Sequence, residues 1–228
     1  MIQKSQTILR AGLLVFAIVL GLEGSWLTAT EAVRPQVPYF PTGATAAAAA
    51  SEQRANVAIA ASLGVIRGDL WASYAVALSS DLLADVAAAS SSASPALSEN
   101  SVASAIKASG FAPFDSRIWL LLAIVDARLE RSASEPLKMS YYTGPNDVAL
   151  TPSRLLVASR TAAIADPELQ ILVGREIRMI VSRKPDLRPA LFAAYREASP
   201  EGKRFIESEV GGLDRDLAAA IRTGGPAR

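Results

Sequence analysis

Residues 105–123 read "AIKASGFAPFDSRIWLLLA", and residues 58–75 read "AIAASLGVIRGDLWASYA". Both stretches contain Ala-Ile-x-Ala-Ser, then a turn, and then an Asp shortly before a Trp. The pattern predicts a helix that packs through small alanines, a tight connection, and a second helix with an Asp near its N-terminus and an anchoring Trp. Trp71 and Trp119 are predicted to occupy equivalent positions. Two such units can bury apolar surface against each other that a single unit would leave exposed, so the repeat predicts a stack of antiparallel helical hairpins.

The second copy resembles the tetratricopeptide repeat in its spacing of a small residue, a Pro, a Trp, a Leu and a second small residue, which are Ala108, Pro113, Trp119, Leu122 and Ala123. The first copy matches at four positions but has Val65 where the family has Pro; the matches are Ala60, Trp71, Tyr74 and Ala75. A third possible copy around Pro185 has Leu191 in place of the Trp. The resemblance covers about residues 50 to 200 and implies a TPR-like stack of helices.

Composition supports an all-α protein. Half of the 228 residues are hydrophobic but only 6% are aromatic, so the core must consist mainly of Ala, Leu, Val and Ile, which favours closely packed helices. Alternating Val, Thr and Tyr runs of the kind that form sheets are nearly absent. We therefore expect a helical-repeat domain over residues 50–222.

The N-terminus predicts export. Residues 1–10 carry Lys4 and Arg10 and are expected in the cytoplasm, and residues 11–30 form an apolar run that contains Glu23. This run suits an uncleaved single-pass anchor in the bacterial inner membrane with the bulk of the chain in the periplasm. Trp26 fits an interfacial position in such an anchor. The alternative is a cleaved signal peptide and a secreted periplasmic protein.

Three segments are predicted to lack regular structure. Residues 31–49 form a Pro/Ala-rich linker in which the prolines of "RPQVPYFPTG" act as a stiff spacer, although the chain becomes helix-forming from Ala44. Residues 87–100 are a Ser/Ala-rich flexible loop. Residues 223–228 are a disordered tail.

The C-terminal half contains two clear signals for the start of a helix. Asp166-Pro167-Glu168 and Ser199-Pro200-Glu201 each read as an N-cap, a proline in the first turn and an early acidic residue that complements the helix dipole. Between them, five apolar residues are predicted to share one face of a helix: Leu169, Leu172, Val173, Ile177 and Ile180. Arg175 and Arg178 point largely away from that face.

The chain has no His and no Cys. This excludes Ser-His and Cys-His nucleophiles, Cys-containing zinc sites and disulfides, and we predict no catalytic site, no metal and no cofactor. Ser104 and Lys107 have the S-x-x-K spacing of penicillin-recognising enzymes, but the companion motifs are missing, so a hydrolase is a distant alternative. Nucleic acid is not an expected partner of an exported domain.

The stretch 138–155, "KMSYYTGPNDVALTPSRL", is the candidate interaction site, and it is equally a candidate joint between two helical blocks. In the joint interpretation, Gly144 ends one helix in the left-handed conformation and Asn146 caps the next, or Thr151-Pro152 restarts it. The rings of Tyr141 and Tyr142 are buried in the joint with their hydroxyls on backbone groups at the helix ends. Arg154 is the nearby charge predicted to matter for function.

Two functional hypotheses follow. The first is a membrane-anchored periplasmic scaffold whose helical-repeat surface mediates protein–protein interaction with another envelope protein. The second is an accessory factor for cell-surface polysaccharide production or export, in which Arg175 and Arg178 contact acidic polysaccharide or lipid headgroups. The second rests on a layout similar to small, uncharacterised alphaproteobacterial membrane-anchored envelope proteins.

Overall fold

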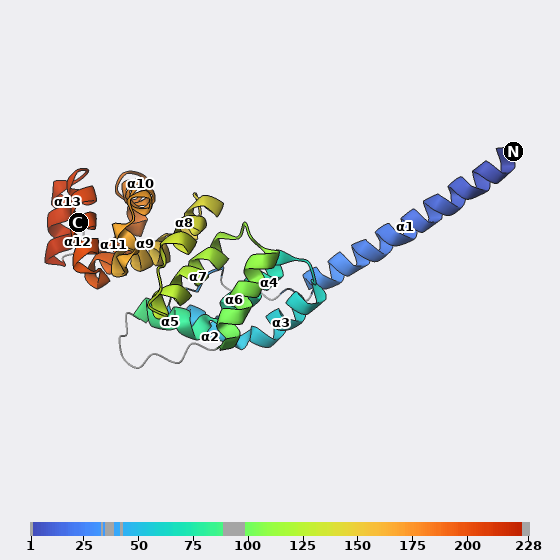
Figure 1. Cartoon of the computed structure of the whole chain (residues 1–228), viewed down its shortest axis with the longest axis horizontal. Coiled ribbons are helices and arrows are strands. Elements are labelled where there is room, and N and C mark those ends of the chain that lie inside the picture. The colour runs from blue at the N-terminus through green and yellow to red at the C-terminus, as the bar shows by residue number, and fades with distance from the viewer. Residues whose placement is uncertain (1, 33, 35–38, 42, 89–98, 225–228) are drawn as a thin grey trace.

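The computed structural model describes residues 2–32, 34, 39–41, 43–88 and 99–224. Within these ranges the chain is all-helical and contains no strand, which confirms the predicted all-α class. One long helix projects from an elongated body, in which the N-terminal and C-terminal blocks of helices lie side by side (Figure 1). The predicted loop 87–100 falls largely outside the described residues, as does the end of the predicted tail.

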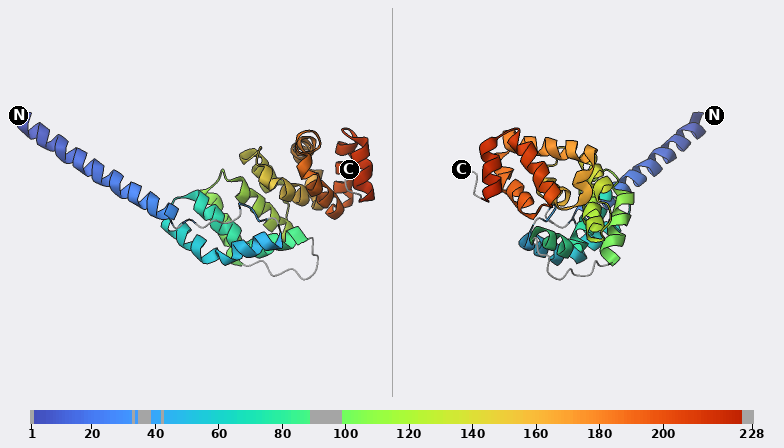
Figure 2. Two further views of the ribbon diagram at one scale, coloured as in Figure 1. Left: turned by 180° about the vertical axis from the view of Figure 1, so that it is seen from behind. Right: turned by 60° about the vertical axis from the view of Figure 1, so that its left-hand side comes forward.

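The projecting helix is α1, Ile2–Ala32. Its apolar stretch Leu9–Ala32 is 24 residues long and contains an 18-residue window with a mean hydropathy of 1.7, none of which is buried. Nearer the body, Thr30 is buried. Both further views in Figure 2 also show α1 projecting away from the body. The chain therefore has one N-terminal helix that is long and apolar enough to cross a membrane or to serve as a signal sequence.

Six helices form the N-terminal block: α2 (Ala44–Glu52), α3 (Arg54–Leu63), α4 (Gly68–Leu78), α5 (Ser80–Ala88), α6 (Glu99–Phe111) and α7 (Ser116–Arg128). The two predicted repeats are the α3–α4 and α6–α7 hairpins, which pack together mainly through α4 and α6. Their buried alanines include Ala60, Ala75 and Ala108, and these small side chains let the helices approach closely.

The two tryptophans are equivalent, as predicted. Trp71 donates its indole N–H to the carbonyl of Val65 at 3.0 Å, and Trp119 donates to that of Pro113 at 2.7 Å, so each indole closes the turn that starts six residues earlier. The aspartates differ. Asp115 caps α7 by accepting the N–H of Arg117, whereas Asp69 lies inside α4 and pairs with Arg67. Both aspartates thus lie near the start of the second helix, as predicted, although only Asp115 is the N-cap residue. A relation to TPR repeats stays a prediction.

The predicted linker, 31–49, is partly packed on the body. Helix α2 starts at Ala44, where the chain was predicted to become helix-forming, and Phe40 is buried in the main hydrophobic core. Tyr39 donates its hydroxyl to Asp147 Oδ2 at 2.7 Å, and the guanidinium of Arg117 lies 4.6 Å from the centre of its ring. The segment between α1 and the body is therefore fixed to the body at its end.

The C-terminal block contains six α-helices and three short 3₁₀ turns. Its elements are α8 (Ser134–Thr143), η1 (Val148–Leu150), α9 (Thr151–Arg160), η2 (Ala162–Ala165), α10 (Pro167–Arg183), η3 (Pro185–Leu187), α11 (Arg188–Glu197), α12 (Pro200–Gly211) and α13 (Arg215–Thr223). Asp166 caps α10 by accepting two backbone N–H groups, and Ser199 caps α12, both as predicted. The predicted apolar face of α10 is confirmed, with Leu172 partly buried and the other four residues buried.

Helix α8 connects the two blocks. It packs along α7 of the N-terminal block and also contacts α9 and α10. Leu137 of α8 and Leu120 and Leu121 of α7 are buried in the same core as Ile177 of α10. The chain that leaves α8 therefore lies where both blocks meet, which is where the candidate site was predicted.

Candidate interaction site

The stretch 138–155 is built differently from the prediction at two backbone positions. Gly144 ends α8 with φ −145° and not in the left-handed conformation, and Asn146 is exposed and does not cap a helix. The 3₁₀ turn η1 starts after Asp147, and α9 starts at Thr151 with Pro152 in its first turn. The alternative in which Thr151-Pro152 restarts the helix is therefore correct.

Gly144 is required for a close approach. A β-carbon at this position would lie 2.6 Å from both Cβ and Oγ of Ser116, which is too short for any real contact. The carbonyl of Gly144 also accepts a hydrogen bond from Nη1 of Arg154 at 2.9 Å. The small residue lets the end of α8 lie directly on the start of α7 while its backbone binds α9.

Arg154 is the centre of the joint. Only 1% of its surface is exposed. Its guanidinium donates to the hydroxyl of Ser140 at 3.0 Å, to the carbonyl of Ser140, and to Gly144, and it lies 4.7 Å from the centre of the Tyr141 ring. Arg154 is therefore a buried charge, and its importance for function stays a prediction. A planar fork with several donors fits the carbonyls at the end of α8, so Arg154 ties α9 to that end.

Glu176 of α10 is the second buried charge of the joint. Tyr141 donates its hydroxyl to Oε2 at 2.5 Å, and Thr151 donates to Oε1 at 2.7 Å. The predicted burial of Tyr141 is correct, but its hydroxyl binds a carboxylate and not a backbone group. Tyr142 is half-exposed and donates its hydroxyl to Glu168 at the start of α10, so burial was wrong for this ring.

The joint continues to Tyr39, in the segment that precedes α2. Ser140 donates to the carbonyl of Ser116 at 2.8 Å, and Ser116 donates to Asp147 at 3.1 Å, the carboxylate that also accepts from Tyr39. Polar groups thus link the segment before α2, the start of α7, the end of α8 and the faces of α9 and α10. Such a connected network holds the two blocks in one arrangement.

Two single substitutions separate the roles of the tyrosines. We expect Tyr141→Phe to lower the free energy of unfolding by about 1–2 kcal/mol, because the buried Glu176 loses a donor that nothing replaces. Tyr142→Phe serves as the matched control and should leave it unchanged within error, since water replaces the donor to Glu168. Urea unfolding of the full chain in detergent, followed by circular dichroism, measures both. An equal loss of unfolding free energy in both variants would contradict the different roles assigned to Tyr141 and Tyr142.

The ionisation of Glu176 couples stability to pH. Burial is the main cause that raises its pKa above 4.5, although the two hydrogen bonds and the positive charge of Arg154 act in the opposite direction. A raised carboxyl pKa means that the folded state holds a proton longer than the unfolded state does. The contribution of Glu176 is therefore fully present below pH 4.5 and is lost as the pH rises through the raised pKa.

The loss of stability with rising pH gives a second prediction. Above pH 4.5 the free energy of unfolding should fall with a limiting slope of about 1.4 kcal/mol per pH unit, and Glu176→Gln should remove that slope. Glu52→Gln is the control, because Glu52 carries the same carboxyl group at an exposed position outside the joint. Urea titrations at a series of pH values give the slopes. If Glu52→Gln flattened the profile and Glu176→Gln did not, the assignment to Glu176 would be wrong.

A cavity of about 490 Å³ opens beside this carboxylate, between the 145–151 segment and α10. Its apolar walls include Pro145, Val148, Leu172 and Met179, and Asn146 lies at its edge. Three cations also line it, Arg175, Arg183 and Lys184, and within the described part of the chain none of them forms an ion pair. The cavity can bind a ligand that has both anionic and apolar groups. Arg178 does not belong to it and pairs with Glu209 at 3.3 Å.

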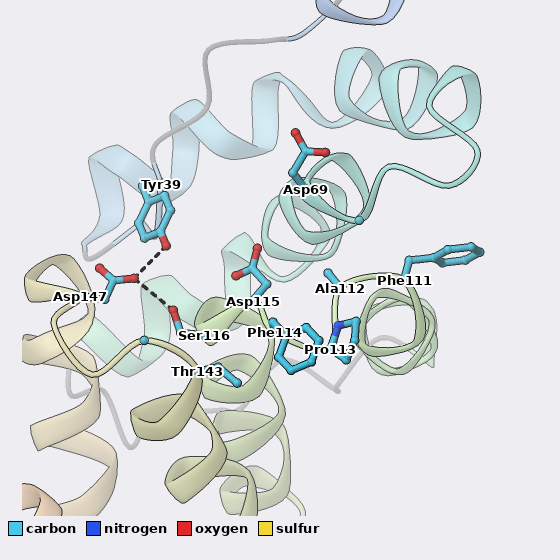
Figure 3. A pocket seen from close by; sticks show the side chains of 12 residues that line it. Tyr39, Asp69, Phe111, Ala112, Pro113, Phe114, Asp115, Ser116, Thr143 and Asp147 are labelled. Atoms are coloured by element: carbon cyan, nitrogen blue, oxygen red, sulfur yellow. Dashed lines mark hydrogen bonds between the residues drawn. The ribbon is translucent and has the colours of Figure 1, made fainter. Parts of the chain in front are cut away.

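A second hollow of about 500 Å³ lies on the other side of the joint, between the start of α4, the α6–α7 turn and the 143–147 segment (Figure 3). Three carboxylates line it, but each has a partner. Asp69 pairs with Arg67, Asp115 pairs with Arg117 at 2.6 Å, and Asp147 accepts from Tyr39 and Ser116. No group of acidic side chains in the described ranges is arranged to hold a metal ion.

Glu176 was not predicted as a site residue, although the sequence contains a signal for it. Glu176 follows Leu169, Leu172 and Val173 at the i+7, i+4 and i+3 positions, so it interrupts an otherwise apolar face. A lone acid at such a position must find partners when the face is buried. The S-x-x-K residue Lys107 has a different role, because its ammonium group lies 3.9 Å from the centre of the Trp71 ring.

No protein-family model matches the chain, and no match was found among curated proteins or solved structures.

Proposed function

We propose that the protein is a single-pass membrane scaffold whose helical body stands on the periplasmic side and binds an acidic, partly apolar segment of another envelope protein. The cavity beside α10 carries the proposal. Its volume is in the range of ligand sites, its walls are apolar, and its cations have no partner among the described side chains. Those cations are exposed and can pair with an anionic group of a partner, while the walls can make apolar contact with it.

The shape of the joint supports this function. A polar network that spans both blocks keeps the α8–α9 connection and α10 at a fixed separation, so the cavity is formed before a partner arrives. A preformed site costs little ordering free energy on binding. The exposed apolar helix α1 fits a membrane anchor, which would hold the site close to partners in the same membrane.

Acidic polysaccharide is the competing ligand, since the same three cations would attract it. The apolar wall distinguishes the two. Leu172 and Met179 contribute contact area to a peptide with apolar side chains but little to a chain of acidic sugars, which is why we favour the peptide.

Site-specific photo-crosslinking tests the proposal in intact membranes. A photoreactive amino acid at Leu172 faces the cavity, and the same group at its exposed neighbour Ile171 is the matched control. We expect a protein adduct at Leu172 that is absent at Ile171 and is lost when Arg175→Glu and Arg183→Glu are introduced. Arg160→Glu, a charge reversal on the exposed end of α9, should leave the adduct in place.

The opposite results are equally clear. Adducts of equal yield at both positions would show that the cavity is not the binding site. Retention of the purified chain on an immobilised acidic polysaccharide, released by salt and abolished by the same two charge reversals, without any protein adduct, would favour the polysaccharide hypothesis.

A further inference from the structure

The turn between α3 and α4 exposes apolar side chains at the end of the body from which α1 leaves. Leu63, Val65 and Ile66 are all exposed, Ile66 by 72%. Phe111 lies next to this turn, because its ring stacks on Trp71 with the ring centres 5.5 Å apart. These four residues, Leu63, Val65, Ile66 and Phe111, are called the apolar footprint below. Packing within the chain leaves each of them at least 40% exposed.

Turn chemistry does not account for the footprint. Val65 has φ +26°, in the left-handed region where glycine or asparagine is the usual choice and where a branched side chain is strained. A branched apolar residue is nevertheless present, with its side chain exposed. The position therefore carries a cost in the folded chain that an apolar environment for the side chain would offset.

The contact between α1 and the turn fixes where the footprint lies relative to a membrane. Trp26 of α1 donates its indole N–H to the carbonyl of Leu63 at 2.8 Å. Trp26 belongs to the apolar stretch Leu9–Ala32. The α3–α4 turn is therefore level with Trp26, which lies within the part of α1 that is apolar enough to span a membrane.

Helix geometry gives the depth. A hydrocarbon core needs about 20 helical residues, and a span that starts after the last leading charge, Arg10, then ends near Thr30. Trp26 is four residues before that end, roughly 6 Å at 1.5 Å per residue. The carbonyl of Leu63, and the apolar side chains beside it, lie at the same level, where the acyl chains meet the headgroups.

Charged groups lie further along α1, as this placement requires. Arg67, which follows Ile66, pairs with Glu31 at 3.0 Å, and Arg34 pairs with Asp69 at 3.4 Å. Glu31 and Arg34 lie at or beyond the end of the apolar stretch, Arg67 directly precedes α4, and Asp69 lies in its first turn. The apolar side chains and the ion pairs are thus separated along the direction of α1 in the order that a bilayer surface imposes.

We propose that the apolar footprint inserts into the outer-facing leaflet of the membrane that α1 crosses, so that the body rests on the bilayer and does not swing freely on its anchor. The proposal depends on the membrane anchoring included in the proposed function. Its consequence is orientation: with the footprint in lipid, the body holds one angle to the membrane, and the cavity beside α10 stays at a fixed height above the surface.

Spin labels on single cysteines test this directly, because the chain has no cysteine of its own. Ile66→Cys and Val65→Cys are the test positions, and Phe16→Cys reports on α1 itself. Ile171→Cys and Leu213→Cys are matched controls, since both replace exposed aliphatic residues far from the anchor along the chain. The full chain is reconstituted in nanodiscs of phosphatidylethanolamine and phosphatidylglycerol. Relaxation by oxygen, which concentrates in lipid, is compared with relaxation by a water-soluble nickel chelate.

We expect the labels at positions 65, 66 and 16 to be relaxed mainly by oxygen and those at 171 and 213 mainly by nickel. Labels at 65 and 66 that respond to nickel as strongly as the controls, while position 16 responds to oxygen, would overturn the footprint and leave the anchor intact. A nickel response at position 16 as well would overturn the anchor and, with it, the proposal.

Discussion

Replacing Arg154 with alanine is expected to lower the free energy of unfolding by about 4 kcal/mol, the range for breaking a buried, hydrogen-bonded charge network by removing one partner. The guanidinium satisfies the carbonyls of Ser140 and Gly144 and the hydroxyl of Ser140, and it provides the positive charge near the buried carboxylate of Glu176. Without it, the two carbonyls lose their charged donor and keep only the backbone N–H groups of Gly144 and Asp147. The hydroxyl of Ser140 and the carboxylate of Glu176 lose the nearby positive charge, and a cavity of the size of the side chain remains.

The matched control is Arg160→Ala. Arg160 belongs to the same helix, α9, but its side chain is exposed, so the free energy of unfolding should be unchanged within error. Arg154→Lys tests geometry at constant charge. One ammonium group cannot reproduce the fork on two carbonyls and a hydroxyl, so most of the loss should remain. Urea unfolding of the full chain in detergent measures all three, and equal stability of the Arg154 and Arg160 alanine variants would contradict the role assigned to Arg154.

Much of the fold follows from local sequence. Asp166 and Ser199 cap helices because each precedes a proline that starts one, and such signals act over three or four residues. The equivalence of Trp71 and Trp119 was also predictable, since each of two similar turns places an indole N–H against the backbone carbonyl six residues earlier. The face that α10 buries could be predicted from the spacing of its apolar residues alone.

The joint was predictable in position but not in its contacts. The pattern of prolines and tyrosines locates the connection, yet the partners of Tyr141 and Arg154 depend on how α7, α8 and α10 pack. Arg154 has the sequence surroundings of a surface charge, and its burial is decided by Gly144 lying against Ser116, which brings the end of α8 within its reach. Tertiary contacts of this kind leave no local pattern in one sequence. Glu176 is the exception, as an acid on an apolar face.

Replacing Gly202 with alanine should have the second-largest effect. Gly202 is in the first turn of α12, where its Cα faces the end of α9. A β-carbon there would overlap the carbonyl oxygen of Ser159 and lie 2.9 Å from its carbonyl carbon. That carbonyl already accepts the backbone N–H of Ser199 at 2.9 Å and its hydroxyl at 3.0 Å. Because the obstacle is backbone, the helices must separate, and we expect a loss of about 3 kcal/mol, at the upper end for overpacking.

Gly211→Ala, at the other end of the same helix, is the matched control for Gly202→Ala. Its β-carbon would lie 4.0 Å from Cβ of Ala218, an ordinary contact, and alanine is a better helix former than glycine, so stability should rise by up to about 0.5 kcal/mol. The same substitution is thus expected to change stability in opposite directions at two positions about 13.5 Å apart along one helix, by its rise per residue. Urea unfolding of both variants decides the matter: a Gly202→Ala chain as stable as Gly211→Ala would mean that α12 does not lie against the end of α9.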